Sequence, residues 1–469
     1  MTVASISRDH ILRDYYAFLA RKKRQAKMMG LQSVPSLHPS LFAYQADVTD
    51  YLLRVGRGAA FLDTGMGKSF ISLEWGRVIM EHTNKPVLML APLAVGPQHE
   101  REAARFGIQA KYIRSPDTIT GTGIWISNYE RLHLFDPSMF GGLILDESSI
   151  VKNFTGKTSR ALIAFGESVP YRLAATATPA PNDHMELGQH SAFLGAMASN
   201  EMLARWFTAD QSEMGKYRLK KYGVSDFWSW VASWARMASR PSDLGHSDDG
   251  FLLPKLHQDL HYVEVDLTEG RKDGELFRAI DTSATQIHQE KRRTAGARAE
   301  RVAELVAAES GESWVIWCDT DYEADELTAR IPDAVEVRGS MPLEMKEDRL
   351  NAFSAGEVRH LVTKPSVAGF GLNWQHCARS AFVGLSFSYE AYYQAIRRLW
   401  RFGQQRPVNV HITLAETEGA IWHTIQRKAR DHERMKREMN SAMRRAIQES
   451  EVKVSYRPTI AARLPGWLA

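Results

Sequence analysis

The sequence predicts an α/β protein made of two doubly wound parallel-sheet lobes, with a helical insertion and a long C-terminal helix. Short apolar runs alternate with helical patterns from about residue 40 to 195, and a second alternating block begins near residue 300. Such alternation is typical of a parallel sheet with helices on both faces. A chain of 469 residues is also too long for one small core, which favours two or three domains.

The first lobe is expected over residues 40–255, and five apolar runs predict its strands. These runs read "AAFLDTG", "PVLMLAP", "GIWISNY", "GLILDE" and "YRLAATATP". Residues 196–250 change to a tryptophan-rich helical pattern, which we interpret as a helical insertion in this lobe. Within it, "FWSWVASWARM" (227–237) places aromatic residues at helical spacing. A base-stacking platform is one interpretation of this run, and we favour core packing.

The second lobe is expected over residues 300–419, after a connecting helical segment at 256–299. Its strands are predicted by "SWVIWCD", "AVEVRG", "RHLVTK", "SAFVGL" and "VNVHITL". Residues 420–469 are expected to form a basic helix and a tail. Three roles are open for this helix: a solvated arm, a DNA contact, or a brace across the two lobes. We favour the brace. Residues 1–39 are expected to form a basic helix over 8–29 and a linker, "SVPSLHPS".

Positive charge is concentrated at the two ends of the chain. Residues 1–40 hold seven basic and two acidic side chains, and residues 420–449 hold eight and four. Basic ends on a mildly acidic body suit a polyanionic partner, although two solvated helix faces give the same pattern. The two cysteines, Cys318 and Cys377, have no CxxC spacing, which argues against a disulfide framework or a cysteine zinc site and favours a reducing cytoplasm. No apolar run reaches the roughly 20 residues that a membrane span needs, and the charged N-terminus does not resemble a signal peptide.

The stretch "FLDTGMGKSF" predicts a phosphate-binding loop. Gly65 and Gly67 allow a tight turn in which successive backbone N–H groups point into one concavity. Lys68 is expected to reach the β- and γ-phosphates and the Ser69 hydroxyl to ligate Mg²⁺, while the helix that begins near Lys68 adds its N-terminal dipole. Leu62 stands where the consensus loop has a small residue.

A pair of carboxylates, Asp146 and Glu147, ends the apolar run in "GGLILDESSIVKN". Taken alone, the pair would be an ordinary polar strand end. Together with a phosphate-binding loop it supplies what phosphoryl transfer needs, one acid for Mg²⁺ and one group that orients the attacking water. We therefore expect Asp146 to hold Mg²⁺ through water and Glu147 to activate the nucleophile.

Residues 40–425 resemble the superfamily-2 helicase-like ATPases, specifically the SWI/SNF-type branch in a compact phage or prophage form. "LFAYQADVTDYLL" resembles the adenine-recognition motif, "DTGMGKS" motif I, "APLAVGPQHERE" motif Ia and "ISNYERL" the next tracking motif. "DESSIVKN" resembles motif II, and "LAATATPAPNDHMELGQHSAFL" resembles motif III with its SWI/SNF extension. In the second lobe, "WVIWCDTDYEADEL", "SVAGFGLNW" and "YYQAIRRLWRFGQQRPVNVHITL" are similar to motifs IV, V and VI.

The resemblance implies two RecA-like lobes with ATP and Mg²⁺ bound between them. It implies that Gln45 reads the base, and that Gln394, Arg398 and Arg401 face the nucleotide across the cleft. A guanidinium group there suits the charge that develops on the γ-phosphate. The nucleotide-binding positions that complete the set are Thr64, Gly65, Met66, Gly67, Lys68, Ser69 and Gly371, and the implied nucleic-acid contacts are Pro92, Asn128, Thr178, Lys364 and Gly369.

Three positions depart from the family pattern. Ser149 stands where motif II usually ends in histidine, and if it takes over the coupling role it should hydrogen-bond toward Thr176 or Thr178. Motif V usually begins with Ser or Thr, where this chain has "TKPS". His99 stands where many relatives have tryptophan, and we interpret it as a surface helix residue.

The function that the resemblance implies is a DNA-dependent ATPase that moves along double-stranded DNA without separating its strands. We expect it to act as a monomer in the cytoplasm of a bacterial or phage-infected cell. A strand-separating DNA or RNA helicase is the first alternative. The second is a nucleotide-switched DNA-binding scaffold that serves a nuclease or a replication or recombination partner. The presence of Glu147, Arg398 and Arg401 argues against the scaffold, since a pure switch could lose them.

Overall fold

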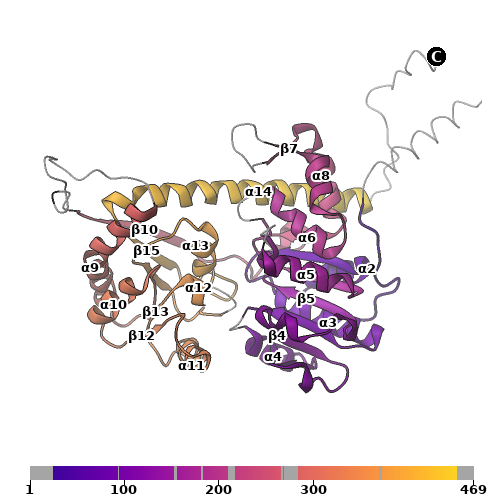
Figure 1. Cartoon of the computed structure of the whole chain (residues 1–469), viewed down its shortest axis with the longest axis horizontal. Coiled ribbons are helices and arrows are strands. Elements are labelled where there is room, and N and C mark those ends of the chain that lie inside the picture. Colours follow the sequence, from indigo (N-terminus) through magenta and orange to yellow (C-terminus); the bar gives the residue numbers. More distant parts are fainter. Residues whose placement is uncertain are drawn as a thin grey trace, which may run out of the picture.

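The protein forms two α/β lobes that lie side by side, with one long helix running across both (Figure 1). The structure is a computed structural model, and it describes residues 25–92, 95–152, 156–180, 183–209, 217–265, 268, 284–368 and 372–451. Lobe 1 is built on a seven-stranded sheet and lobe 2 on a six-stranded sheet. The predicted fold class, two parallel-sheet lobes and a C-terminal helix, is confirmed.

All strands of the lobe 1 sheet are parallel, in the order β3-β4-β2-β5-β6-β1-β9. Their bounds are Arg57–Leu62 (β1), Val87–Ala91 (β2), Ala110–Tyr112 (β3), Ile124–Asn128 (β4), Gly142–Asp146 (β5), Tyr171–Ala175 (β6) and Ala235–Ala238 (β9). The five strands predicted from apolar runs are all present, and the structure adds β3 and β9 at the two edges. The helices of this lobe are Ala43–Val55 (α2), Lys68–Thr83 (α3), Gly96–Arg105 (α4), Lys157–Glu167 (α5), Leu187–Leu194 (α6), Ser199–Trp206 (α7) and Val224–Ala232 (α8).

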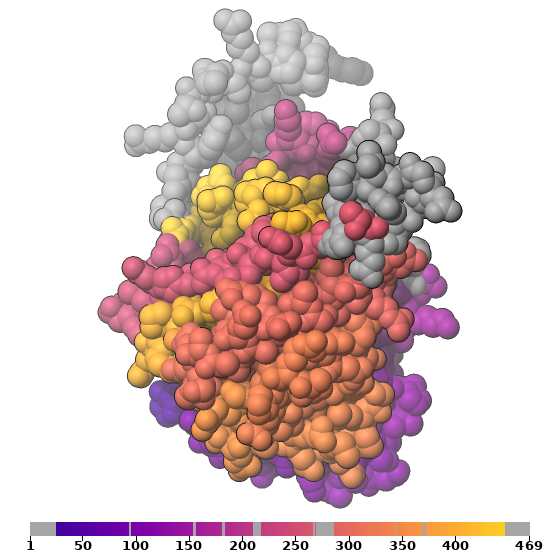
Figure 2. Space-filling model, turned by 90° about the vertical axis from the view of Figure 1, so that its left-hand side faces the viewer, coloured from indigo at the N-terminus to yellow at the C-terminus, as the bar shows by residue number. Residues whose placement is uncertain are grey.

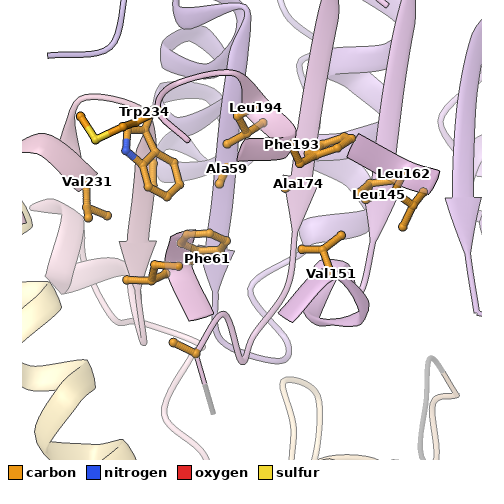
Figure 3. Packing of buried hydrophobic residues seen from close by; sticks show 14 of the residues in the cluster. Ala59, Phe61, Leu145, Val151, Leu162, Ala174, Phe193, Leu194, Val231 and Trp234 are labelled. Atoms are coloured by element: carbon orange, nitrogen blue, oxygen red, sulfur yellow. The ribbon is translucent and has the colours of Figure 1, made fainter. Parts of the chain in front are cut away.

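The lobe 1 sheet is buried on both faces, which is why its strands read as continuous apolar runs. Along β1, Ala59 and Phe61 belong to one hydrophobic cluster, whereas Ala60 and Leu62 belong to the cluster on the opposite face. In Figure 3, Phe61 lies close to Trp234, and the two rings meet edge to face with their centroids 5.9 Å apart. Both faces of the sheet therefore hold the strand that leads into the phosphate loop.

The tryptophan-rich segment in lobe 1 is only partly helical, which corrects the helical insertion expected at 196–250. It contains α7 and α8, but also a hairpin of Phe207–Ala209 (β7) and Tyr217–Leu219 (β8), and the edge strand β9. Helix α8 ends at Ala232 because the chain then pairs with β1, beginning with the bond from Ala59 N–H to the Trp234 carbonyl at 2.9 Å. Trp228, Trp230 and Trp234 are buried, so the expected core packing is confirmed.

The lobe 2 sheet is also fully parallel, in the order β10-β15-β14-β11-β13-β12. Its strands are Leu256–Val263 (β10), Trp314–Trp317 (β11), Ala334–Val337 (β12), His360–Thr363 (β13), Arg379–Phe382 (β14) and Val408–Ala415 (β15). Its helices are Ala284–Ala308 (α9), Asp321–Arg330 (α10), Leu343–Ser354 (α11), Pro365–Ala368 (α12) and Tyr389–Ile396 (α13). The assignment of 256–299 to a helical connector is wrong for β10, which pairs along its whole length with β15. As an edge strand with several exposed side chains, β10 lacks the apolar run that marks its neighbours.

Helix α14 (Gly419–Glu451) is the long helix that crosses both lobes. Near its start, Ile421 and Ile425 enter the core of lobe 2. Further along, Met435, Met439 and Met443 enter a core cluster of lobe 1, at the four-residue spacing of one helix face. The brace is therefore the alternative that the structure supports, and Figure 2 shows part of the helix exposed above the orange surface of lobe 2.

The basic helix expected at 8–29 lies outside the described residues except for residues 25–29, which are described and are not helical; the tail after residue 451 also lies outside them. Among the helices that are described, none has the length and apolar character required to cross a membrane. Cys318 and Cys377 are both buried, with free thiols.

Candidate active site between the lobes

The phosphate loop connects β1 to α3 and depends on two glycines with positive φ. Gly65 has φ +91° and Gly67 has φ +73°, a region that residues with a side chain rarely adopt. A Cβ atom at Gly67 would lie 2.1 Å from Nε2 of Gln45, so a side chain there would displace the Gln45 amide. Helix α3 begins directly after Gly67, at Lys68, and its N-terminal N–H groups and dipole favour an anion at this point.

Lys68 lies within the concavity of this loop. Its Nζ donates to the carbonyl oxygens of Leu62 at 2.9 Å and Asp63 at 3.4 Å. Desolvation lowers the pKa of Lys68, while the nearby charges of Glu147, Asp63 and Asp146 act in the opposite direction. The charge of Lys68 therefore interacts with those of the two predicted catalytic carboxylates, Asp146 and Glu147.

Gln45 supports the loop from α2. Its Oε1 accepts the backbone N–H of Phe42 at 3.0 Å, and its Nε2 lies 3.3 Å from both the Met66 carbonyl and the Tyr44 hydroxyl. The Tyr44 hydroxyl also donates to the Met66 carbonyl, at 2.9 Å. In this arrangement both polar atoms of the Gln45 amide are bonded to the protein, and the side chain holds the phosphate loop at Met66.

Asp146 and Glu147 meet this loop at the carboxyl end of β5. Asp146 is buried, and Glu147 has φ +52°, an unfavourable conformation for a residue other than glycine and one that clusters at active sites. Thr176, just after β6, donates its hydroxyl to Oε2 of Glu147 at 3.2 Å. Burial raises the pKa of Glu147, and Asp146 raises it further, against the opposing effects of Lys68 and Arg398.

His99 is a buried partner of Asp146, which corrects its interpretation as a surface residue. Its side chain is 1% exposed, and Nε2 lies 2.9 Å from Oδ2 of Asp146. Burial alone would raise the pKa of Asp146, but His99 and Lys68 outweigh burial and hold that pKa below its usual value. The sequence carried a signal for the burial of His99, though not for its partner, because His99 shares the buried stripe of α4 with Gly96 and Ala103.

The glutamine and the two arginines that were predicted in lobe 2 also lie at the site. Gln394 lies on α13, and Arg398 and Arg401 follow in the turn after it; all three are buried in part or in full. Both arginines donate to the Leu372 carbonyl at 3.2 Å. Among the described residues, Nε2 of Gln394 and Nε of Arg401 are buried without a hydrogen-bond partner. These donors are available for a ligand.

The positive charges of these arginines interact with the carboxylates of lobe 1. Burial lowers the pKa of Arg398 to about 10, and the charges of Glu147 and Asp146 oppose that shift. Burial, together with the adjacent Arg398, lowers the pKa of Arg401 to about 9. Both groups stay positively charged at neutral pH, in a buried setting where an anion would be stabilised.

Glu147 also lines a cavity of about 430 Å³ between the lobes. Its lining includes Pro92, Tyr129, Glu147, Ser149 and Lys152 from lobe 1 and Gly339, Lys346, Ser366, Val367 and Glu390 from lobe 2. Thr178 donates to Oε1 of Glu390 at 3.4 Å, and Lys152 forms a salt bridge with the same carboxylate. Glu390, which the sequence did not single out, thus ties α13 to two segments of lobe 1.

The predicted nucleic-acid contacts differ in how accessible and how well paired their side chains are. Pro92 lines the cavity, and Lys364 forms an ion pair with Asp321 at 3.0 Å. Asn128 and Thr178 are buried, with Oδ1 of Asn128 accepting from a tyrosine hydroxyl at 2.9 Å. Gly369 and Gly371 lie outside the described residues.

The expected bond from Ser149 to motif III is not formed. The Thr176 hydroxyl donates to Glu147 and the Thr178 hydroxyl to Glu390. Motif III is thereby linked to lobe 2 by Glu390 and not through Ser149, which lines the cavity.

Comparison with known families identifies the second lobe. Residues 297–403 match the family described as the helicase conserved C-terminal domain, a span from α9 through α13 to the arginines just described. No curated protein matches the chain. The chain thus combines a helicase C-terminal domain of superfamily-2 type with a second parallel α/β lobe. This combination is that of a helicase-type NTPase that acts on nucleic acid.

Proposed function

We propose that this protein is a DNA-dependent ATPase of SWI/SNF type that uses ATP hydrolysis to move along double-stranded DNA. The observation that carries the ATPase part is the convergence of three groups between the lobes. Lys68 on the phosphate loop, Glu147 after β5, and the arginines Arg398 and Arg401 of lobe 2 interact electrostatically across one buried site. Phosphoryl transfer needs this combination of positioning and charge stabilisation.

The residues present fit ATP and Mg²⁺. The glycine turn and the start of α3 form an anion cradle, and the orphaned donors of Gln394 and Arg401 need an acceptor that the described protein does not provide. Ser69, in the first turn of α3, and Asp146 would hold Mg²⁺, which when bound neutralises charge on the phosphate oxygens. In this proposal Lys68 binds the β- and γ-phosphates.

Glu147 would act on the attacking water. Its φ of +52° and its bond from Thr176 fix the direction of the carboxylate at the inner wall of the cleft. The raised pKa of Glu147 makes it a better proton acceptor than an exposed glutamate. Arg398 and Arg401 come from the other lobe, so the charge that develops on the phosphate would be stabilised only while the lobes are closed.

DNA is proposed to run along the side of the cleft where Pro92 and Lys364 lie. The basic excess of residues 420–449 supports a polyanionic track, since phosphate contacts supply affinity without reading sequence. The resemblance to the SWI/SNF branch favours duplex DNA over single strands. Stimulation of ATP turnover should therefore be similar for duplexes of different sequence and should require more DNA as the salt concentration rises.

A triplex-displacement assay on blunt duplex DNA tests this proposal, run beside a strand-separation assay on a forked duplex. A duplex translocase displaces the third strand only with ATP and leaves the fork annealed. Efficient unwinding of the fork would instead assign the protein to the strand-separating helicases. Binding of DNA that changes with nucleotide but without turnover would assign it to the nucleotide-switched scaffolds.

A further inference from the structure

Asp63, the residue that leaves β1 and enters the phosphate loop, is the meeting point of three distant segments. Its Oδ1 lies 3.1 Å from Nη2 of Arg397 and accepts a hydrogen bond from the Tyr393 hydroxyl, both in lobe 2. Its Oδ2 lies 2.9 Å from Nζ of Lys436, on α14. The Asp63 side chain is 10% exposed, so this junction is largely closed to water.

Lobe 2 also contacts the loop residues that follow Asp63. Nη2 of Arg397 donates to the Thr64 carbonyl at 2.8 Å. At Gly65, an added Cβ would lie 2.8 Å from the backbone nitrogen of Phe402, so the two backbones are in direct contact. Three successive residues at the start of the phosphate loop are therefore held by the segment that also carries Arg398 and Arg401.

The charges at the junction are strongly coupled. Burial alone would raise the pKa of Asp63, but Arg397 and Lys436 outweigh burial and hold that pKa far below the ordinary range. The same carboxylate raises the pKa of Lys436 despite burial. All three groups therefore stay ionised across the working pH range, and two cations on one carboxylate leave a net positive charge beside the phosphate loop.

We propose that Asp63 is the docking point through which lobe 2 and α14 set the position of the phosphate loop, with Arg397 and Lys436 as positioning residues for ATP hydrolysis. This inference rests on the proposed ATPase function. When the lobes separate, Arg397 leaves Asp63 and Thr64, and the start of the loop loses its contacts with lobe 2. The loop would then hold one fixed position only in the closed state, and α14 would favour that state.

The test compares Arg397→Gln, Arg397→Lys and Lys436→Met with a matched control, Arg444→Met. Arg444 also joins α14 to lobe 1, through an ion pair with Asp243 at 2.7 Å, but it does not touch the phosphate loop. Asp63 itself is left unchanged, because its removal would leave two buried cations unpaired. Steady-state ATP turnover gives kcat and KM for each full-length variant, and thermal unfolding identifies any variant that does not fold.

Interlobe distance supplies a second readout that does not depend on turnover. Fluorophores on cysteines introduced at the exposed positions Tyr222 in lobe 1 and Met345 in lobe 2 report that distance by energy transfer without nucleotide. The native cysteines, Cys318 and Cys377, are buried, which favours selective labelling.

We expect Arg397→Gln to lower kcat by about a hundredfold, as misplacement of a catalytic loop by about 1 Å can do. Arg397→Lys should recover part of this loss, since its ammonium group reaches Asp63 but cannot also bridge to Thr64. Lys436→Met should lower kcat less, and both Arg397→Gln and Lys436→Met should lengthen the interlobe distance.

Wild-type kcat in Arg397→Gln and Lys436→Met would overturn the inference. A loss of kcat in Arg397→Gln with no change in interlobe distance would also overturn it, because Arg397 would then act on the chemistry directly. If Arg397→Gln does not fold, the difference between Lys436→Met and Arg444→Met decides the question. If the wild-type protein does not hydrolyse ATP, the proposed function fails, while the interlobe distances still test the docking.

Discussion

Replacing His99 with leucine should weaken divalent-metal binding at Asp146. The substitution puts an apolar side chain of similar bulk in a site that is 1% exposed, and removes Nε2, which lies 2.9 Å from Oδ2 of Asp146. The carboxylate would stay buried with one partner fewer and a less defined orientation. Loss of such an outer-shell partner typically costs about 10- to 100-fold in metal affinity, or about 1.4 to 2.7 kcal/mol.

Two assays measure this effect. One is the Mg²⁺ concentration that gives half-maximal ATP turnover, and the other is Mn²⁺ binding in the presence of ADP, followed by electron paramagnetic resonance. His99→Gln should behave like the wild type, because its amide nitrogen can take the place of Nε2. Gln98→Leu on the same helix is the control, since the Gln98 amide donates to Glu102 at 2.8 Å and no contact with Asp146 is found among the described residues. Wild-type Mn²⁺ affinity in His99→Leu would refute the role assigned to the histidine.

Further substitutions test other parts of the site and the brace. Lys68→Ala should weaken ATP binding, whereas Glu147→Gln should bind ATP and not turn it over; equal losses of affinity for a fluorescent ATP analogue would remove the distinction. Glu390→Gln removes the charge paired with Lys152. It should lower DNA-stimulated ATP turnover by roughly fivefold (about 1 kcal/mol) and leave basal ATP turnover unchanged. A proportional loss of both rates would argue against a role of Glu390 in coupling. Burial lowers the pKa of His432 to about 3, whereas the pKa of histidine in an unfolded chain is about 6.5. As the pH falls below about 6.5, the unfolded state therefore binds a proton that the folded state does not, and the free energy of unfolding decreases. Between pH 8 and 5 the wild type should lose about 2 kcal/mol more than His432→Phe in urea unfolding, and parallel pH profiles would contradict this.

The sequence predicted most strands because the sheets are buried on both faces. Strands such as β2 and β5 are fully buried, so each is an uninterrupted apolar run. The strands that were missed in the two large sheets lack that property for separate reasons. Strand β10 lies at an edge with exposed residues, β3 has three residues, and β9 follows a helix within one tryptophan-rich run.

The site could be predicted where its residues are close in sequence. The glycine loop with Lys68, and the adjacent pair Asp146 and Glu147, carry their chemistry in local spacing. His99 and Arg397 were missed because their partners are distant in sequence: Nε2 of His99 meets Asp146, and Arg397 meets Asp63 across the interface between the lobes. Such contacts depend on how α4 and the turn after α13 pack, which the spacing of residues in the sequence does not specify.

ATP hydrolysis by this protein is proposed to depend on duplex DNA, and ATP turnover with and without blunt duplex DNA tests that dependence most directly. The wild type should hydrolyse ATP slowly alone and several-fold faster with duplex of any sequence, while Glu147→Gln should stay inactive under both conditions. Turnover that does not change with duplex, or that rises only with single-stranded nucleic acid, would contradict the account.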